Sequence, residues 1–144
     1  MNFLEDINLI NRQVLVRVDY NVPIERGVVI DDYRITQSLP TINYCLDNNA
    51  SVVLMSHLGR PNGKKNLDYS LKPIALKLEE VLGRKVHFSE DCIGEKAKLK
   101  CSLMKPGEIT LLENVRFYKE ETKGDISFAK KLASNGDCYI NDAF

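Results

Sequence analysis

The sequence predicts a doubly wound α/β fold, in which helices cover both faces of a parallel sheet. Short, continuously apolar segments recur along the 144 residues, and such segments are typical of strands that are buried on both faces. Segments with helical periodicity separate them, as crossover connections between parallel strands require. No internal repeat or linker interrupts this alternation, so we expect residues 1–144 to belong to one domain.

The first half of the chain predicts three strands and one helix. Residues 14–18 are rich in β-branched side chains and precede a polar stretch, which predicts a strand followed by a loop. Residues 28–30 predict a small extra strand. The apolar residues of 32–46 repeat at helical spacing, and Pro40 is tolerable there only as a kink or near a helix start. Residues 51–55 are apolar throughout and predict a buried strand.

The second half repeats the alternation. Helical periodicity with glycine or Pro-Gly near its end predicts helices at residues 70–83, 95–103 and 125–136. Short apolar segments predict strands at residues 85–88, 109–112 and 138–140. The complete pattern predicts a Rossmann-like arrangement of three layers, α/β/α.

The composition is typical of a folded globule without a general affinity for polyanions. Lysine and arginine together number 20, and aspartate and glutamate also number 20, so the formal net charge is zero. A neutral protein lacks the overall positive field on which nonspecific nucleic-acid binding depends. We therefore expect no nucleic-acid partner, and any anion site must be local.

The sequence also predicts neither membrane insertion nor secretion. The longest wholly apolar runs have four or five residues, against the roughly 20 that cross a bilayer. Residues 1–6 lack the basic and apolar regions of a signal peptide, which predicts a cytoplasmic location. The four cysteines are scattered without a CxxC pair, so we expect free thiols rather than a zinc or redox site.

Candidate ligand-binding residues follow from the predicted sheet, because open parallel sheets bind ligands beyond the carboxyl ends of their strands. The residues that follow the strands are Asp19, Asn21, Ser56, His57, Gly59, Arg60, Glu113, Asn114, Arg116, Asn141 and Asp142. His57, Arg60 and Arg116 belong to this set, and Arg34, near a helix start, could reach the same crevice. Such a cation cluster predicts a small, multiply charged anion as the ligand, such as a sugar phosphate or an acid phosphate.

Structural explanations compete with this interpretation. Each arginine could pair with a surface carboxylate, and two aspartates directly precede the Tyr-Arg34 pair. Asp19 and Asn21 could hold a substrate hydroxyl, but on spacing alone we favour a role in stabilising the turn. A lone histidine after a strand, such as His57, is as often structural as functional.

The known nucleotide-binding motifs are not matched. Residues 59–65 read GRPNGKK and superficially resemble the phosphate loop GxxxxGK[ST]. Three residues separate the glycines, however, and Lys65 stands where serine or threonine would bind magnesium. Pro61 also removes a backbone donor that such a loop uses. GxGxxG is absent, so the sequence does not predict a dinucleotide or nucleotide site, and we expect any phosphate donor to bind elsewhere. We also predict no metal site in this chain.

Five blocks of sequence resemble the phosphoglycerate kinase family, in order and at familiar spacing. They are RVDYNVP at 17–23, DDYRI at 31–35, SHLGRP at 56–61, LLENVRF at 111–117 and NDAF at 141–144. The resemblance covers essentially the whole chain. It implies a glycolytic enzyme that transfers a phosphoryl group between 1,3-bisphosphoglycerate and ADP, with 3-phosphoglycerate held by the N-terminal domain and the nucleotide by the C-terminal domain.

The resemblance also implies roles for individual residues. The residues implied to bind 3-phosphoglycerate are Asp19, Tyr20, Asn21, Arg34, His57, Leu58, Gly59, Arg60 and Arg116. Asp19 and Asn21 would contact the glycerate, and the cations after the strands would bind its phosphate end. Arg34 would neutralise charge on the transferring phosphoryl group, which makes it the residue expected to be catalytic. Phosphoryl transfer needs mainly positioning and charge stabilisation, so a crevice lined by arginines suits it.

Members of this family continue beyond the NDAF block with further phosphate contacts, the rest of the sheet and a nucleotide domain. We therefore expect residues 1–144 to form an incomplete N-terminal domain that is inactive alone and binds no magnesium, ATP or ADP. The resemblance implies that the complete enzyme is monomeric and uses magnesium with ATP or ADP.

Two other functions remain open at this point. A noncatalytic module that binds an anion or sugar phosphate would keep Arg60 and Arg116 but would not need Arg34, so the presence of all three favours the enzyme. A phosphate-loop nucleotidase depends on GRPNGKK alone, and ATP binding by this chain would be needed to support it.

Overall fold

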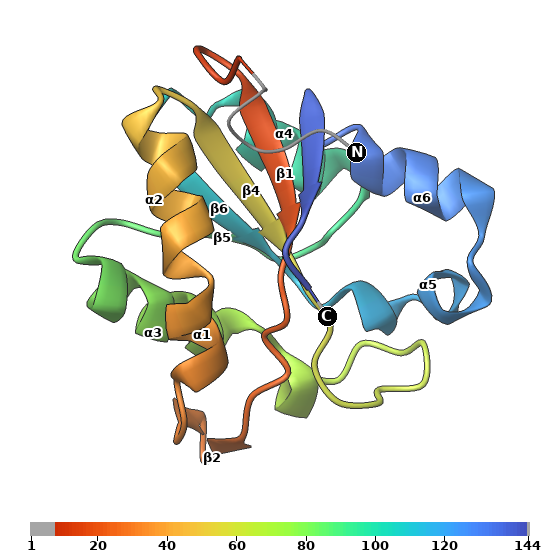
Figure 1. The fold of residues 1–144 in the computed structure, drawn as a ribbon. Helices are drawn as coiled ribbons and strands as arrows, with labels where there is room; N and C mark the ends of the chain where they lie inside the picture. The colour runs from red at the N-terminus through yellow and green to blue at the C-terminus, as the bar shows by residue number, and fades with distance from the viewer. Residues whose placement is uncertain (1–7, 144) are drawn as a thin grey trace.

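A computed structural model describes residues 8–143. Residues 1–6, on which the expectation about a signal peptide rests, and Phe144 of the NDAF block lie outside the described residues. Within this part of the chain, parallel strands form a five-stranded sheet in the order β5-β6-β4-β1-β7 (Figure 1). The strands are β1 (Gln13–Arg17), β4 (Ser51–Met55), β5 (His87–Ser89), β6 (Ile109–Leu112) and β7 (Cys138–Asn141).

The register brings the carboxyl ends of the strands to one edge of the sheet. Arg17, the last residue of β1, pairs with Met55 of β4 and with Asn141 of β7. Leu54 of β4 pairs with Leu111 of β6. A hairpin of β2 (Ile24–Glu25) and β3 (Val28–Val29) lies beyond the same edge, at the bottom of Figure 1. The segments that follow β1, β4 and β6 therefore emerge side by side.

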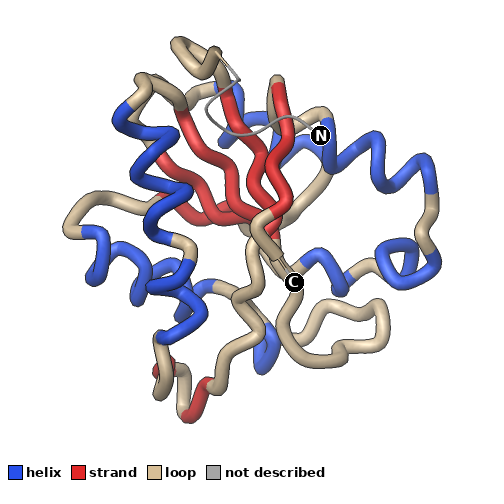
Figure 2. Tube along the Cα trace, in the orientation of Figure 1, coloured by secondary structure: helices blue, strands red, loops and turns tan. Residues whose placement is uncertain are grey.

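Helices cover both faces of the sheet, which confirms the predicted three layers (Figure 2). The helices packed on one face are α1 (Tyr33–Gln37), α2 (Leu39–Asp47) and α3 (Lys72–Leu82). Those packed on the other are α4 (Gly94–Ser102) and α6 (Ile126–Ala133). Successive side chains of a strand point to opposite faces, so Val14 and Val16 pack with the first group and Leu15 with the second.

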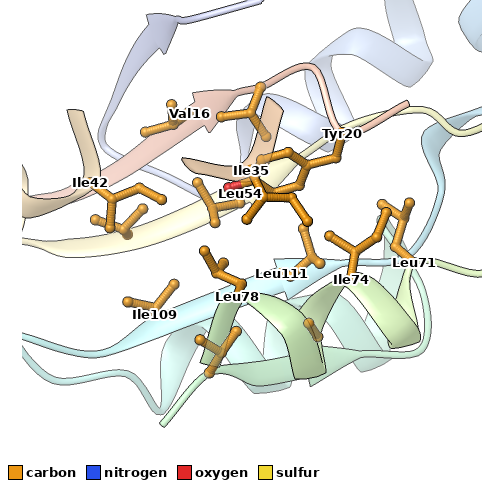
Figure 3. Packing of buried hydrophobic residues seen from close by; sticks show 14 of the residues in the cluster. Val16, Tyr20, Ile35, Ile42, Leu54, Leu71, Ile74, Leu78, Ile109 and Leu111 are labelled. Carbon is orange, nitrogen blue, oxygen red and sulfur yellow. The ribbon is translucent and has the colours of Figure 1, made fainter. Parts of the chain in front are cut away.

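The larger apolar cluster lies between the sheet and helices α1 to α3 (Figure 3). Ile35 of α1, Ile74 of α3 and Leu54 of β4 meet there without exposed surface. Burying an aliphatic or aromatic side chain of this size contributes about 1.5–3 kcal/mol. Tyr20 lies in the same cluster, and its hydroxyl is 2.6 Å from the hydroxyl of Ser38. Burial raises the pKa of Tyr20 well above its ordinary value.

One predicted helix is in fact two. The structure divides residues 32–46 into α1 and α2 at Ser38, and Pro40 lies in the first turn of α2. Proline has no N–H to donate and is accommodated best in the first turn of a helix, where no intrahelical acceptor is available. With a new helix starting at Ser38, the missing N–H of Pro40 therefore costs no helical hydrogen bond, whereas a kink within one long helix would lose one.

Other differences are confined to short elements. Strand β5 begins two residues later than the predicted 85–88 strand, and the predicted 28–30 strand pairs with β2 as a hairpin. Three one-turn elements were not predicted: η2 (Leu67–Tyr69), η3 (Val115–Phe117) and α5 (Lys119–Lys123). Such elements are too short to show a hydrophobic period.

The four cysteines are free thiols. Cys45, Cys92 and Cys101 are buried, and burial raises the pKa of Cys45 and of Cys101 to about 11. Of the helices in residues 8–143, none has both the length and the apolar character that crossing a membrane requires.

Candidate anion-binding site

Five of the candidate residues line two hollows at the carboxyl edge of the sheet. The first, of about 320 Å³, contains Asp19, Arg34 and Asp142. The second, of about 620 Å³, contains Arg60 and Arg116. Arg34 lines the hollow beside β1 and β7, while Arg60 and Arg116 line the hollow beside β4 and β6.

Arg34 is held at the rim of the first hollow by two acceptors. Its Nη1 donates to Asp19 Oδ1 at 3.1 Å and to the carbonyl of Asn21 at 2.8 Å. The side chain of Arg34 is 50% exposed. A guanidinium carries five N–H donors, so most of them stay available to a ligand. Asp19 thus orients Arg34, and neither of the two preceding aspartates forms an ion pair with it.

Asn21 connects the first hollow to the loop that carries Arg60. Its side-chain oxygen accepts the backbone N–H of Gly59 at 2.9 Å. Its own N–H donates to Asp19 Oδ1 at 3.1 Å, which is the turn-stabilising bond expected from the spacing. Asn21 therefore stabilises its turn, and its side chain also links the segments that follow β1 and β4.

The second hollow carries an uncompensated positive charge. Lys119 and Lys123 line it together with Arg60 and Arg116. None of these four cations has a carboxylate of residues 8–143 within 4.0 Å. The nearby carboxylate of Glu121 pairs instead with Arg17. Nε of Arg116 is buried and has no hydrogen-bond partner among the described residues. These charges make the hollow suitable for a multiply charged anion.

Sequence reasoning missed the two lysines because α5 was not predicted. A usable signal was present, since Lys119 and Lys123 are spaced i and i+4, the spacing of one helical face. The intervening Glu120 and Glu121 obscured it by cancelling the local charge.

Tyr20 and Leu58 position the site through their backbone rather than through their side chains. Both side chains are buried, Tyr20 completely and Leu58 with 6% exposure. The N–H of Tyr20 donates to the hydroxyl of Ser56 at 2.9 Å. The Leu58 carbonyl accepts from the side chain of Asn114 at 2.8 Å. Their side chains are therefore part of the core.

His57 lies in a positive environment that disfavours its protonation. Burial first, and then the charges of Arg116 and Arg17, lower the pKa of His57 below its ordinary value of 6.5, against the weaker opposing effects of Asp19 and Glu121. The imidazole is therefore neutral at pH 7. It can donate one hydrogen bond to an anion without adding to the repulsion between the cations.

We expect the low pKa of His57 to make the fold sensitive to acid. The unfolded chain binds this proton more tightly than the folded chain does, so stability is full above about pH 6.5 and declines as the pH falls. A urea denaturation series from pH 7.5 to 5.5 should show a smaller decline for His57→Gln than for the unmodified chain. An NMR titration observes both histidines of the chain, His57 and His87. Replacing Arg116 with alanine should raise the pKa of His57 in that titration. Identical pH profiles for the two chains would contradict this prediction.

Gly63 fixes the loop after β4 against the start of α5. Its φ is +74°, and a Cβ added there would lie 2.6 Å from the Cβ of Lys119 and 2.9 Å from its backbone nitrogen. No ordinary Cβ contact is that short. The close approach holds the Arg60 loop and Lys119 on opposite sides of the same hollow.

Gly63→Ala is accordingly expected to destabilise the fold by about 2–4 kcal/mol, from positive-φ strain together with overpacking. Gly124→Ala is the matched control, because its φ is +66° and a Cβ there would meet nothing within 4 Å. Gly124→Ala should lower the free energy of unfolding by the backbone strain alone, which is about 1–2 kcal/mol. Urea denaturation of both variants measures the difference, and equal losses would show that the contact with Lys119 is easily relieved.

Residues 8–143 contain no group of three or more His, Cys, Asp or Glu side chains placed to hold a metal ion. The carboxylates of the site are committed otherwise. Asp19 pairs with Arg34, and burial raises the pKa of Asp142 while a hydrogen bond with Thr41 opposes the rise.

Fold and site together define an open parallel α/β protein with cationic side chains gathered at the carboxyl edge of its sheet. The comparison with family models is more specific, since the model described as phosphoglycerate kinase matches residues 4–144. The chain therefore belongs to the phosphoglycerate kinase family, as its sequence blocks indicated.

Individual relatives agree with this assignment. A phosphoglycerate kinase of Moorella thermoacetica is 54% identical over 141 residues, which is 98% of this chain and 36% of the relative. One of Borrelia garinii subsp. bavariensis is 56% identical over 133 residues, 92% of this chain and 34% of the relative. This chain thus spans about a third of the length of the curated relatives that it matches.

Solved structures support the fold in the same way. The phosphoglycerate kinase of Pyrococcus horikoshii OT3 superposes with a TM-score of 0.88 at 37% identity, over 99% of this chain and 36% of that one. The phosphoglycerate kinase of Coxiella burnetii gives a TM-score of 0.86 at 38% identity, over 97% of this chain and 34% of that one. Similarity at this level confirms the α/β fold of the described part.

Proposed function

We propose that this chain is the 3-phosphoglycerate-binding part of a phosphoglycerate kinase, and that residues 1–144 are part of its N-terminal domain. The observation that carries the proposal is the second hollow, where Arg60 and Arg116 lie without carboxylate partners among residues 8–143. A phosphate carries about −1.5 to −2 charges at neutral pH, and arginine's planar fork of donors suits its oxygens. The family assignment supports a phosphoglycerate as the substrate, and the two arginines support the second hollow as the position of its phosphate.

In this proposal the two hollows hold the two ends of the substrate. The phosphate lies with Arg60 and Arg116, and neutral His57 donates a hydrogen bond toward it. Arg34, oriented by Asp19, faces the carboxylate end, where the transferred phosphoryl group would arrive. Asn21 joins the two ends through its bond with Gly59. The protein then contributes positioning and charge stabilisation, which are the main requirements of phosphoryl transfer.

The complete enzyme would transfer a phosphoryl group between 1,3-bisphosphoglycerate and ADP in glycolysis, as a monomeric cytoplasmic kinase. The nucleotide and its magnesium would be held by a second domain, since this chain spans only about a third of the length of the relatives that it matches. Magnesium would neutralise phosphate charge there. The chain alone would bind 3-phosphoglycerate and lack kinase activity.

Calorimetric titration of the 144-residue chain tests this proposal directly. We expect heat of binding with 3-phosphoglycerate, a weaker response with inorganic phosphate, which lacks the carboxylate, and none with ATP and magnesium. Circular dichroism should first confirm an α/β fold. A folded chain that ignores 3-phosphoglycerate would contradict the proposed role, and tight ATP binding would favour a phosphate-loop nucleotidase instead. Equal affinities for phosphate and 3-phosphoglycerate would favour a general anion-binding module.

A further inference from the structure

A single buried side chain, that of Asn114, joins the segments that carry the two arginines of the second hollow. Asn114 follows β6 and has no exposed surface. Its Nδ2 donates to the carbonyl of Leu58 at 2.8 Å and to that of Tyr69 at 3.0 Å. Its Oδ1 accepts the backbone N–H of Arg116 at 3.0 Å. Both amide protons and the amide oxygen are therefore in use, and each bond ends on a different segment.

These segments determine where the arginine of the β4 loop lies. Leu58 directly precedes Gly59, and a Cβ added at Gly59 would lie 2.4 Å from the ring of Tyr69. The loop backbone thus rests on that ring, while Asn114 holds the carbonyl groups of both Leu58 and Tyr69. Arg60 is the next residue of the loop. Its backbone is therefore tied to that of Arg116 through one amide group.

The neighbouring Glu113 is also buried, and its carboxylate accepts the backbone N–H of Asn114 at 2.8 Å. Its carboxylate accepts from the hydroxyl of Ser70 at 2.6 Å and from the N–H of Leu71 at 2.8 Å, both at the start of α3. Glu113 anchors a helix, whereas Asn114 anchors the loops of the site. The two side chains therefore bond to different segments, although Glu113 also holds the backbone of Asn114.

The charge of the hollow explains why a neutral group suits this position. Arg60 and Arg116 repel each other and have no carboxylate of the described residues to separate them. A carboxylate at position 114 would lower the positive potential and could not donate to two carbonyl groups. An amide holds the loops and leaves the charge intact.

We propose that Asn114 is a positioning residue, which holds Arg60 and Arg116 in register for one anionic ligand. The role of that ligand as 3-phosphoglycerate rests on the function proposed above, but the positioning itself does not. Misplacing a group by about 1 Å costs as much as 100-fold where geometry matters. The expected loss on replacing Asn114 is therefore large although it touches no ligand.

Hydrogen exchange of the Gly59 amide tests the positioning without any ligand. Asn135→Ala is the matched control for Asn114→Ala, because Asn135 is 2% exposed and its Nδ2 donates to the carbonyl of Cys92 at 2.9 Å, away from the arginine loops. The exchange rate of the Gly59 amide is measured relative to that of the core amide of Leu54. Because local opening speeds exchange, we expect this relative rate to rise at least about tenfold over the unmodified chain in Asn114→Ala, and not to rise in Asn135→Ala. Unchanged relative exchange at Gly59 would overturn the inference.

Binding of 3-phosphoglycerate supplies the second readout. We expect Asn114→Ala to lower affinity at least about tenfold, and its effect to shrink when Arg60 is already alanine, because residues that act through one another are not additive. The inference would be overturned, while the proposed function stood, by either of two results. The effects of Asn114→Ala and Arg60→Ala on affinity could be fully additive, or Asn114→Ala could bind as tightly as Asn135→Ala. If the unmodified chain does not bind, the proposed function fails and the exchange experiment alone decides. Asn114→Ser, which keeps an acceptor for η3, replaces the alanine variant if that variant unfolds.

Discussion

Replacing both Arg60 and Arg116 with alanine is expected to weaken 3-phosphoglycerate binding by about 100- to 10,000-fold. A hydrogen bond to a charged group contributes about 1.5–3 kcal/mol, so two such contacts contribute about 3–6 kcal/mol, at about 1.4 kcal/mol for each factor of ten. The structure explains why little compensation is available, since neither guanidinium gives up a carboxylate partner of residues 8–143 in order to bind. Calorimetric titration of the double variant measures the effect.

The double variant also changes the overall charge, so it needs a control of equal charge. Lys130 and Lys131 lie exposed on α6, away from both hollows. Replacing both with alanine removes the same two positive charges and should change affinity less than about threefold, since screening limits distant charges. An equal loss in the two variants would mean that the general field of the protein, and not the hollow, attracts the substrate.

Replacing Arg34 with alanine is expected to reduce the turnover of a complete kinase that contains this chain by about 100- to 1,000-fold, the usual effect of losing one donor to a transition state. Binding of 3-phosphoglycerate should weaken much less, because Arg34 lines the other hollow from the phosphate-binding arginines. A coupled assay with full-length enzyme separates kcat from KM. Wild-type kcat in this variant would show that Arg34 is not catalytic.

Two further variants make the Arg34 result specific. Arg34→Lys keeps the charge but loses the planar fork of donors, so it should recover only part of the turnover. Arg84 offers a matched control, because it too is exposed and donates from Nη1 to a backbone carbonyl, that of Gly107 at 3.2 Å. Arg84→Ala should leave kcat unchanged, since Arg84 lies at the far end of α3 from the site.

The fold could be predicted because buried parallel strands and amphipathic helices leave a clear pattern in the sequence. The strand at 51–55 was predicted with the bounds that the structure has, and the strand at 109–112 likewise. The split at Ser38 and the short helix α5 could not be predicted, because both depend on one turn of backbone. Five residues are too few to establish a period, and α5 exposes most of its side chains.

The sequence indicated which residues belong to the candidate site, but it did not indicate how they are arranged in space. Topology alone brought Arg60 and Arg116 to one edge, since both follow neighbouring strands. The structure places Arg34 at the first hollow in an ion pair with Asp19, and sequence spacing does not show that pair. The role proposed for Asn114 was equally hidden, because it depends on carbonyl groups 56 and 45 positions away in the chain.

The strand order has a consequence for how the protein is made. β1 is near the start of the chain, yet it lies inside the sheet between β4 and β7, and its Gln13 bonds to Asp137 across 124 positions. A ribosome adds about 5–20 residues per second, so one side of β1 stays open for several seconds after β4 has emerged. During that interval a nascent chain exposes an unpaired strand edge, which is a template for association with other chains. A chaperone that covers β1 during synthesis would therefore reduce association with other chains. The benefit would be greater for this fold than for a fold whose first strand lies at the edge of the sheet.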